Sequence, residues 1–430
     1  MRLRAAYRFE PLVLALVALA ALPVVGITGP QDRTRYELTR HLVLQHTLQV
    51  EPDLFDRAVF GGRTYSDKAP GMSFLAVPAY HAERLTGIAK APRDWQSEGD
   101  LSLWLMRVLT SGVLFLAAVF VVGRLAERLE PGTGAPTAAI FGVATIAAPL
   151  APTFFEHDAA GAFAIAAFAL LWLGRRAPVL ALAGLCAGTA VLFQYATALI
   201  ALALGVYCLW RRGRGVVWYV LGAVPPAVAL GAYDWVAFGS PFHLSYRYVA
   251  NPFAERQHGG FFGIGAPSLD GLREVLFGNR GLLVFSPVLA AAAVGLWLLW
   301  RRGDRAEALL AACMALLFVL LNAGYFLPYG GGSPGPRFLA PALPFLALGL
   351  PPALERFRLP TLALGFASAI LITLDAVTWP VRPYDDTSWI PNRNEIANTV
   401  WTWIVPNRNV GVALVLASAL AAVGAGAIRR

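Results

Sequence analysis

The feature that most constrains this chain is a series of long, almost uncharged apolar runs. Several reach the roughly 18–20 residues that a helix needs to cross the hydrocarbon core of a bilayer. Hydrophobic residues make up 57% of the 430 residues and charged residues only 14%, whereas soluble chains carry about 25% charged residues. The sequence therefore predicts an all-α polytopic membrane protein and excludes a soluble enzyme, a collagen and a disordered chain.

Twelve transmembrane helices are predicted from these runs. Their limits are 11–29, 103–124, 136–153, 157–174, 178–193, 195–210, 216–234, 282–300, 306–327, 338–353, 360–378 and 409–428. We expect the first run to be a retained span, because no small-residue cleavage site follows it. The short, nearly continuous runs at 178–193 and 195–210 predict a helical hairpin. The whole chain, 1–430, is expected to form a single integral membrane domain.

Arginine predicts the orientation of the chain. If the N-terminus is cytoplasmic, the segments on its side of the membrane hold 17 basic and six acidic residues. Short basic loops on one side are the positive-inside pattern of cytoplasmic loops. This topology accounts for the net charge of +9, so nucleic-acid binding is not needed to explain it. We expect a multi-pass protein of the inner membrane with both termini cytoplasmic.

Three long segments, 30–102, 235–281 and 379–408, are expected on the extracytoplasmic side. All six histidines and most acidic residues lie in them or at outer helix ends, so we expect an active site that faces outward. The first segment predicts two interfacial helices, one with Leu38, Leu42 and Val43 on its apolar side. A turn-rich stretch at residues 61–65 between these helices resembles a hairpin.

Four features occur in order along the chain. An Asp follows the first span, and Gly62–Gly71 reads Gly-x-x-Tyr-x-x-Lys-x-Pro-Gly. A polar cluster within Thr153–Ala159 and the Gly-Pro-Arg element of Tyr329–Pro341 follow. Together these features resemble bacterial GT-C glycosyltransferases, in the branch of the protein mannosyltransferases and the lipid A aminoarabinose transferase. Two features depart from the family. Asp32 is followed by Arg33, where the family often has Glu. Many members also end in a soluble outer domain, whereas this chain ends in a predicted helix and two arginines.

The resemblance implies transfer of a sugar from a polyprenyl-phosphate donor by an inverting displacement. The acceptor would be a lipid, a glycan or a protein in contact with membrane lipid. A transporter or a flippase for a lipid-linked sugar is the alternative, which would favour inverted repeats and charges at mid-span. The sequence shows no matching halves, and only Asp375 approaches mid-span.

Asp32 has two interpretations. The resemblance implies that it is the general base, which takes the proton of the acceptor hydroxyl. A carboxylate just beyond a span could instead cap the helix that follows. Glu37 is the second candidate for the base.

Lys68 and Arg337 are the candidate ligands of the donor phosphate. Lys68 is one of only two lysines in the chain, and a compact ammonium suits a phosphate that gains charge as it leaves. Arg337 follows a glycine-rich loop, and glycine lets backbone amides approach an anion closely. Either cation could instead be an interfacial side chain that reaches the lipid headgroups.

Glu156, His157 and Asp158 form the remaining polar cluster. Neighbours on a helix point about 100° apart, so at most two can face one cavity. Asp158 is a candidate acceptor ligand or second acid, whereas Glu156 and His157 suit substrate or metal contacts. Asp375 could contact substrate or pair with an arginine. No cofactor is required by these residues, and the sequence leaves a divalent metal open.

The charge asymmetry makes a topological prediction. Reporter fusions placed after Glu130, Arg176, Gly213 and Gly303 should give a cytoplasmic signal, because basic loops are retained on that side. An outward signal at two or more of these sites would overturn the topology.

Overall fold

A computed structural model describes residues 10–26, 28–89, 101–378 and 396–428. Most of the predicted outer segment 379–408 and both predicted cytoplasmic termini lie outside these residues. The described chain is almost entirely helical, with two short antiparallel strand pairs.

The longer helices follow the predicted apolar runs. They are α1 (Glu10–Ala21), α5 (Val113–Leu129), α6 (Gly134–Val143), α8 (His157–Leu173), α9 (Ala177–Phe193), α10 (Ala198–Arg212), α11 (Val216–Phe238), α15 (Val288–Arg302), α16 (Arg305–Gly324), α19 (Arg358–Val377) and α20 (Arg408–Ala427). Shorter helices continue or connect them: α4 (Leu101–Arg107), α7 (Ala147–Leu150), α13 (Leu269–Phe277), α14 (Leu282–Phe285), α17 (Leu343–Leu346) and α18 (Leu350–Arg356). The predicted hairpin forms, because the extended backbone of Gln194 ends α9 before α10 begins.

Six helical segments of the described chain are long and apolar enough to cross a membrane. They are Leu101–Leu129, Tyr195–Phe238, Arg305–Gly324, Arg337–Arg356, Arg358–Val377 and Arg408–Ala427. A seventh would join Leu269–Phe285 to Val288–Arg302 across a 91° bend. These segments confirm the all-α membrane fold, while the number of twelve spans stays a prediction.

The first predicted span is shorter than its apolar run. Helix α1 ends at Ala21, although the run continues to residue 29. Val24 and Val25 instead form strand β1 (Val24–Val25), which pairs with β4 (Asn398–Thr399) just before α20. A proline at position 23 cannot donate a helical hydrogen bond, which favours this early end.

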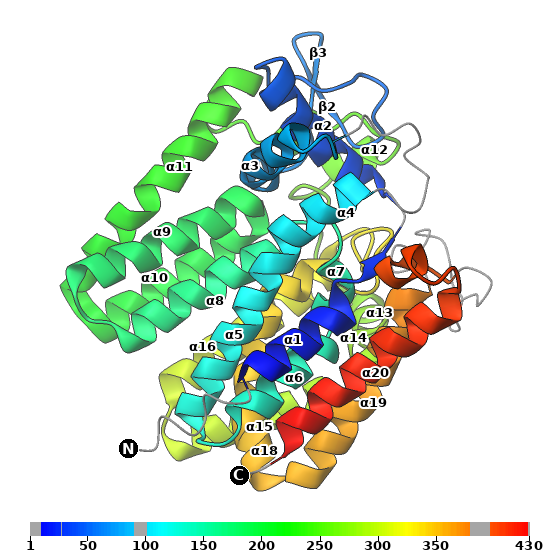
Figure 1. The fold of residues 1–430 in the computed structure, drawn as a ribbon. Helices are drawn as coiled ribbons and strands as arrows, with labels where there is room; N and C mark the ends of the chain where they lie inside the picture. The colour runs from blue at the N-terminus through cyan, green and yellow to red at the C-terminus, as the bar shows by residue number, and fades with distance from the viewer. Residues whose placement is uncertain (1–9, 27, 90–100, 379–395, 429–430) are drawn as a thin grey trace.

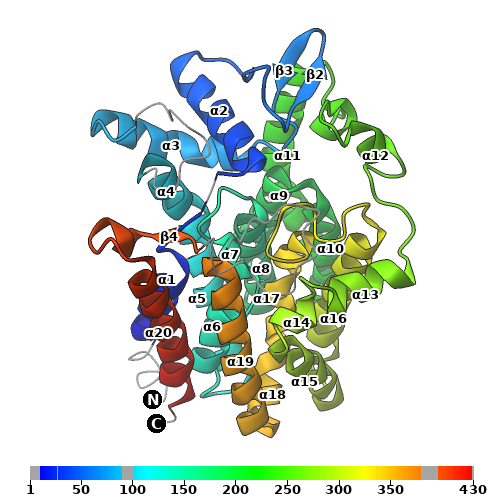
Figure 2. The same cartoon turned by 90° about the vertical axis from the view of Figure 1, so that its right-hand side faces the viewer.

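The residues predicted to be cytoplasmic meet at one end of the molecule. Arg124 pairs with Glu10 at 3.3 Å, and Arg302 pairs with Glu130. Arg358 donates to the carbonyl oxygen of Ala427 at 2.7 Å. These contacts join α1, α5, α15, α19 and α20 at the end shown at the bottom of Figures 1 and 2. The basic loops therefore share one side of the fold, as the charge pattern requires.

The opposite end carries a cap that is formed by the first outer segment. It contains α2 (Pro30–Leu44), strands β2 (Ala58–Phe60) and β3 (Arg63–Tyr65), α3 (Gly71–Leu85) and, from farther along the chain, α12 (Ala254–His258). Gly61 and Gly62 have φ of +57° and +73°, the left-handed region that a tight hairpin turn between β2 and β3 requires. The hairpin-like stretch predicted here is therefore confirmed.

Helix α2 differs from the amphipathic surface helix that was expected. Leu38 and Val43 are buried, but so are Asp32, Arg35 and Glu37. A helix that rests on lipid would turn such charged side chains toward water. Helix α2 is instead enclosed by protein on several sides. Its buried charged residues therefore pair with residues of other segments, as Asp32 does with Arg107 and Arg35 with Glu156.

Helices α9 and α11 cross in close backbone contact. A Cβ atom at Gly184 would lie 1.8 Å from the carbonyl oxygen of Tyr219, and one at Gly222 would lie 1.8 Å from that of Ala181. Small residues that allow such close approach are typical of helix contacts within membranes. Since Gly71, the last residue of the Lys-x-Pro-Gly element, abuts Leu192 of α9, this helix pair also supports the cap.

Substitution of the crossing glycines should separate the two helices. We expect Gly184→Ala and Gly222→Ala each to lower stability by about 1–3 kcal/mol, the usual effect of overpacking. Gly424→Ala in α20 is the matched control, because no heavy atom lies within 4 Å of its added Cβ. Thermal unfolding in detergent would measure the difference, and equal melting temperatures in all three variants would contradict the close crossing.

Candidate functional site

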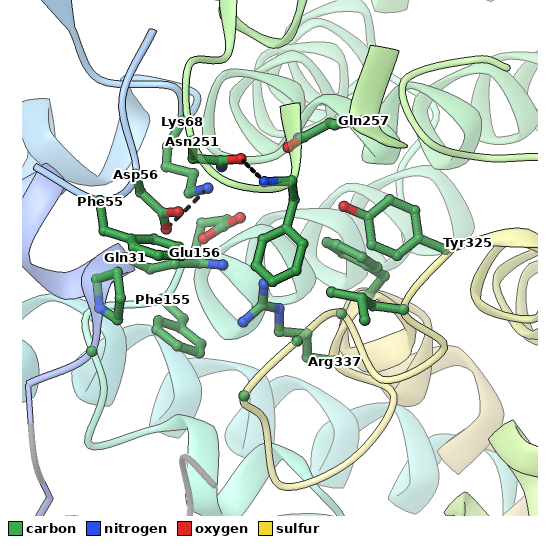
Figure 3. A pocket seen from close by; sticks show the side chains of 18 of the residues that line it. Gln31, Phe55, Asp56, Lys68, Phe155, Glu156, Asn251, Gln257, Tyr325 and Arg337 are labelled. Atoms are coloured by element: carbon green, nitrogen blue, oxygen red, sulfur yellow. Dashed lines mark hydrogen bonds and ion pairs between the residues drawn. The ribbon is translucent and has the colours of Figure 1, made fainter. Parts of the chain in front are cut away.

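A cavity of about 360 Å³ lies between the cap and the helical bundle (Figure 3). Its wall is drawn from segments far apart in the sequence. The lining residues are Thr28, Gly29, Pro30, Gln31, Phe55, Asp56, Lys68, Phe155, Glu156, Tyr246, Asn251, Phe253, Gln257, Tyr325, Phe326, Leu327, Gly330, Gly331, Gly332, Arg337 and Phe338. Aromatic rings and a few charged groups dominate this wall, a composition that is typical of ligand sites.

Lys68 enters the cavity from the connection between β3 and α3. Its Nζ lies 2.9 Å from Asp67 and 3.3 Å from Asp56. Burial disfavours the charged ammonium, but the two carboxylates outweigh it and raise the pKa of Lys68 above its ordinary value. Lys68 is therefore a permanent cation at the wall of the cavity.

Arg337 enters from the opposite wall, at the start of the segment Arg337–Arg356 (Figure 3). Its side chain is 6% exposed, and its guanidinium lies over the rings of Phe155 and Phe338 at 5.2 and 5.5 Å. Gly330, with φ of +83°, leaves it room, because a Cβ there would lie 2.8 Å from Nε of Arg337. Among the described residues, no ion pair or hydrogen bond neutralises this guanidinium.

Glu156 lines the cavity but is already paired. It forms a buried ion pair with Arg35 of α2. Burial alone would raise the pKa of Glu156, but Arg35, His157 and Arg337 lower it to about 2. A carboxylate with so low a pKa is a weak proton acceptor at neutral pH, so Glu156 is better suited to holding charges in place.

Asp32 does not line the cavity; it connects two segments that do. Its Oδ1 accepts from the backbone N–H of Phe154 at 2.6 Å, and its Oδ2 accepts from that of Gly29 at 2.9 Å. Arg107 lies 3.4 Å from the same Oδ2. Asp32 thereby satisfies a backbone N–H at the N-terminus of α2. It also holds two segments that line the cavity, Gly29 and the residues after Phe154, next to each other.

The other residues predicted for the site are buried away from the cavity wall. His157 lies 3.0 Å from the side-chain oxygen of Gln194 through Nδ1. Asp158 lies in the first turn of α8, and Asp375 is buried near the end of α19. Glu37 pairs with Arg40 and lies beside His41. Of the eight predicted residues, Lys68, Glu156 and Arg337 line the cavity.

Sequence reasoning missed two charged contributors to this site. Asp56 stands between Phe55 and Arg57 in a loop without a motif, and Arg35 is one of many arginines. Tyr246 and Tyr325 also line the cavity. Tyr246 lies in the predicted outer segment 235–281, whereas Tyr325 lies near the end of the run 306–327 that was predicted to span the membrane. For Arg35, Asp56 and Tyr246 the only available signal was their place in the predicted outer segments.

The cluster Glu156, His157 and Asp158 does not form a three-ligand metal site in the described chain. The one group of three potential ligands that lie close together is Glu37, His41 and Glu51, on the outer side of α2. None of these three lines the cavity.

The fold is similar to those of two solved proteins, ArnT and AglB. ArnT from Cupriavidus metallidurans bound to undecaprenyl phosphate matches 97% of this chain and 76% of its own, with 16% identity and a TM-score of 0.54. The apo form of ArnT matches with a TM-score of 0.53. The oligosaccharyltransferase AglB from Archaeoglobus fulgidus, in complex with an inhibitory peptide and a dolichol-phosphate, matches 90% of this chain and 61% of its own at 12% identity and a TM-score of 0.51. No protein-family model and no curated protein matches the sequence.

The Arg35–Glu156 pair should be a main determinant of stability. We expect Glu156→Gln to destabilise the protein by about 3–5 kcal/mol, because it leaves a buried guanidinium without its carboxylate. The double variant Arg35→Met/Glu156→Gln should be less destabilised than the single one, since it also removes the buried cation. Thermal unfolding in detergent measures both, and a double variant that is less stable than Glu156→Gln would contradict the pairing.

The same pair should respond to pH in a defined window. Because the folded pKa of about 2 lies below the ordinary value of 4.5, the stability that Glu156 contributes is fully present above pH 4.5. It is lost as the pH falls toward 2. The difference in melting temperature between wild type and Glu156→Gln should therefore be constant near neutrality and shrink below pH 4.5.

Proposed function

We propose that this chain is an integral membrane glycosyltransferase that takes a sugar from a polyprenyl-phosphate donor. The observation that carries the proposal is the buried guanidinium of Arg337, which faces a cavity without an anionic partner among the described residues. A buried guanidinium that forms no direct ion pair with a carboxylate is unfavourable. A phosphate between Arg337 and Lys68 would compensate it and would occupy the centre of the cavity.

The donor is proposed from the chemistry of the wall. Arg337 and Lys68 suit the phosphate, and rings such as Phe253 and Tyr325 suit the faces of a sugar. The ArnT structure contains undecaprenyl phosphate and the AglB structure contains a dolichol-phosphate, so carriers of this class occur within the fold. The acceptor would be a lipid, a glycan or a protein that reaches the cavity on the extracytoplasmic side.

The proposed reaction is a single displacement with inversion. An acceptor hydroxyl oxygen attacks the anomeric carbon, the bond from that carbon to the phosphate oxygen breaks, and the carrier leaves as a phosphate monoester. The leaving phosphate gains negative charge, so Lys68 and Arg337 stabilise the transition state more than the bound donor. The proton of the hydroxyl passes to a carboxylate.

We assign that carboxylate to Asp56 in place of Asp32. Both oxygens of Asp32 already accept backbone hydrogen bonds, and Glu156 is held by Arg35. Asp56 lines the cavity, and its partner Lys68 would turn toward a bound phosphate. This exchange would release an oxygen of Asp56 to accept the proton.

A transporter or a flippase is the competing function. It would move the lipid-linked sugar without breaking the glycosidic bond, and the cation pair would then bind the phosphate equally in every step. Transfer of labelled sugar from a polyprenyl-phosphate donor to an acceptor by the purified protein would support the enzyme. Movement of intact donor across a vesicle membrane without transfer would support the flippase.

The phosphate site makes a kinetic prediction. We expect Lys68→Ala and Arg337→Ala each to lower turnover by about 10²–10³-fold, because each removes a donor aimed at developing charge. Donor affinity should fall less than turnover. Arg63→Ala is the matched control, since it removes an exposed cation of the hairpin outside the cavity. Turnover that is unchanged in both site variants would contradict the proposal.

The choice of base makes a second prediction. Asp56→Asn should lower turnover by about 10²–10⁴-fold, as is usual when a general base is lost. Its melting temperature should fall less than that of Glu156→Gln, because Lys68 keeps Asp67 as a partner. Asp32→Asn should chiefly lower the melting temperature, because it disturbs the hydrogen bonds at the N-terminus of α2 and leaves Arg107 without its carboxylate. Loss of turnover in a fully stable Asp32→Asn would return the role of base to Asp32.

A further inference from the structure

A second cluster of polar residues lies on α2, outside the cavity. Glu37 and His41 are four residues apart, which places them on one face of the helix. Glu51 reaches the same point from the segment that follows the helix. Nε2 of His41 lies 3.6 Å from Oε2 of Glu37 and 3.3 Å from Oε1 of Glu51.

His41 is held in the orientation of a metal ligand. Its Nδ1 lies 2.8 Å from the carbonyl oxygen of Gln49. This oxygen can only accept a hydrogen bond, so Nδ1 donates its proton there, and Nε2 faces the two carboxylates. Metal-binding histidines usually donate their second ring N–H in this way. His41 is 4% exposed, and among the described residues its Nε2 has no hydrogen-bond partner.

The spacing of the three ligand atoms matches a tetrahedral ion. Two ligands that lie about 2.0–2.1 Å from zinc at the tetrahedral angle are about 3.3 Å from each other. The separation of Nε2 of His41 from Glu51, 3.3 Å, equals this value, and that from Glu37, 3.6 Å, is slightly longer. All three ligand atoms lie within 4.8 Å of one another, so small side-chain rotations would complete the site.

We propose that Glu37, His41 and Glu51 bind a divalent transition-metal ion of the zinc type. One imidazole and two carboxylates suit such an ion. The side chain of Glu51 is 44% exposed, so the fourth position faces water. The site goes beyond glycosyl transfer, because none of its ligands lines the donor cavity.

Arg40 is the side chain that competes for this position. Its Nη1 lies 3.0 Å from Oε2 of Glu37 and 3.8 Å from Oε1 of Glu51. One arginine balances only one of the two carboxylates, so the cluster retains a negative charge that a dication would neutralise. The side chain of Arg40 is 27% exposed, which allows it to turn toward solvent when an ion binds.

The ion would fix the segment that supplies Asp56 to the donor cavity. It would join α2 to Glu51, which lies five residues before Asp56 in the same loop. A metal that closes such a loop stabilises the folded cap, since it binds the folded arrangement and not the unfolded chain. The effect on the donor site would be one of positioning.

Binding of Zn²⁺ to the purified full chain in detergent tests the proposal. After treatment with a chelator, the wild type should bind Zn²⁺ and show a higher melting temperature with the ion. His41→Gln and Glu51→Gln should each weaken binding at least about tenfold, since loss of even an outer-shell partner weakens metal binding about 10–100-fold. Competition with a chromophoric chelator measures the affinity, without any assay of sugar transfer.

Matched controls separate this site from adventitious binding. His81→Gln and Glu255→Gln remove an exposed histidine and an exposed carboxylate elsewhere and should leave the affinity unchanged. Because Glu51 is half-exposed, Glu51→Gln tests the site even if His41→Gln fails to fold. Equal affinity in the wild type and Glu51→Gln, or no binding by the wild type, would overturn the proposal.

Discussion

The attachment of α2 to the residues before α8 is the constraint on which the site depends. Asp32 accepts from the backbone N–H of Phe154, and Arg35, one turn later, pairs with Glu156. More than a hundred residues separate the two segments in the sequence. Because these polar groups are buried, removing them from water costs free energy. The hydrogen bond of Asp32 and the ion pair of Arg35 together offset this cost. The cap is therefore held to the bundle by a specific polar contact in addition to apolar packing.

This attachment leaves Arg337 without a direct partner in the cavity. Glu156 pairs with Arg35, and Asp56 and Asp67 both pair with Lys68. Arg337 comes from the bundle rather than the cap, and among the described residues its guanidinium contacts the rings of Phe155 and Phe338 instead of a carboxylate. The three carboxylates and three cations balance in number, so the pairing geometry, and not an excess of charge, leaves this guanidinium available to an anionic ligand.

Helix α2 has different chemistry at its two ends. Its first turns face the cavity wall and the segment before α8, while Glu37 and His41 meet Glu51 on the outer side. The segment from Glu51 to Asp56 joins these two regions within a few residues. A change in the outer cluster would therefore reach the cavity through a short and continuous stretch of chain, with no need for rearrangement of the bundle.

The sequence by itself determined the membrane class, the helical content, the common side of the basic loops and the hairpin at Gly61–Gly62. These features depend on local composition and periodicity, which the order of residues records directly. It also singled out Lys68, Glu156 and Arg337 through the motifs that contain them, together with five residues that do not line the cavity.

Only the tertiary structure decided which charges share a cavity. Asp56 and Arg35 carry no local signature, and the contact of Asp32 with the backbone N–H of Phe154 joins two segments that are far apart in the sequence. The early end of α1 was decided in the same way, by the pairing of Val24 with Thr399. Contacts between distant segments depend on how helices pack, and neither composition nor periodicity contains that information.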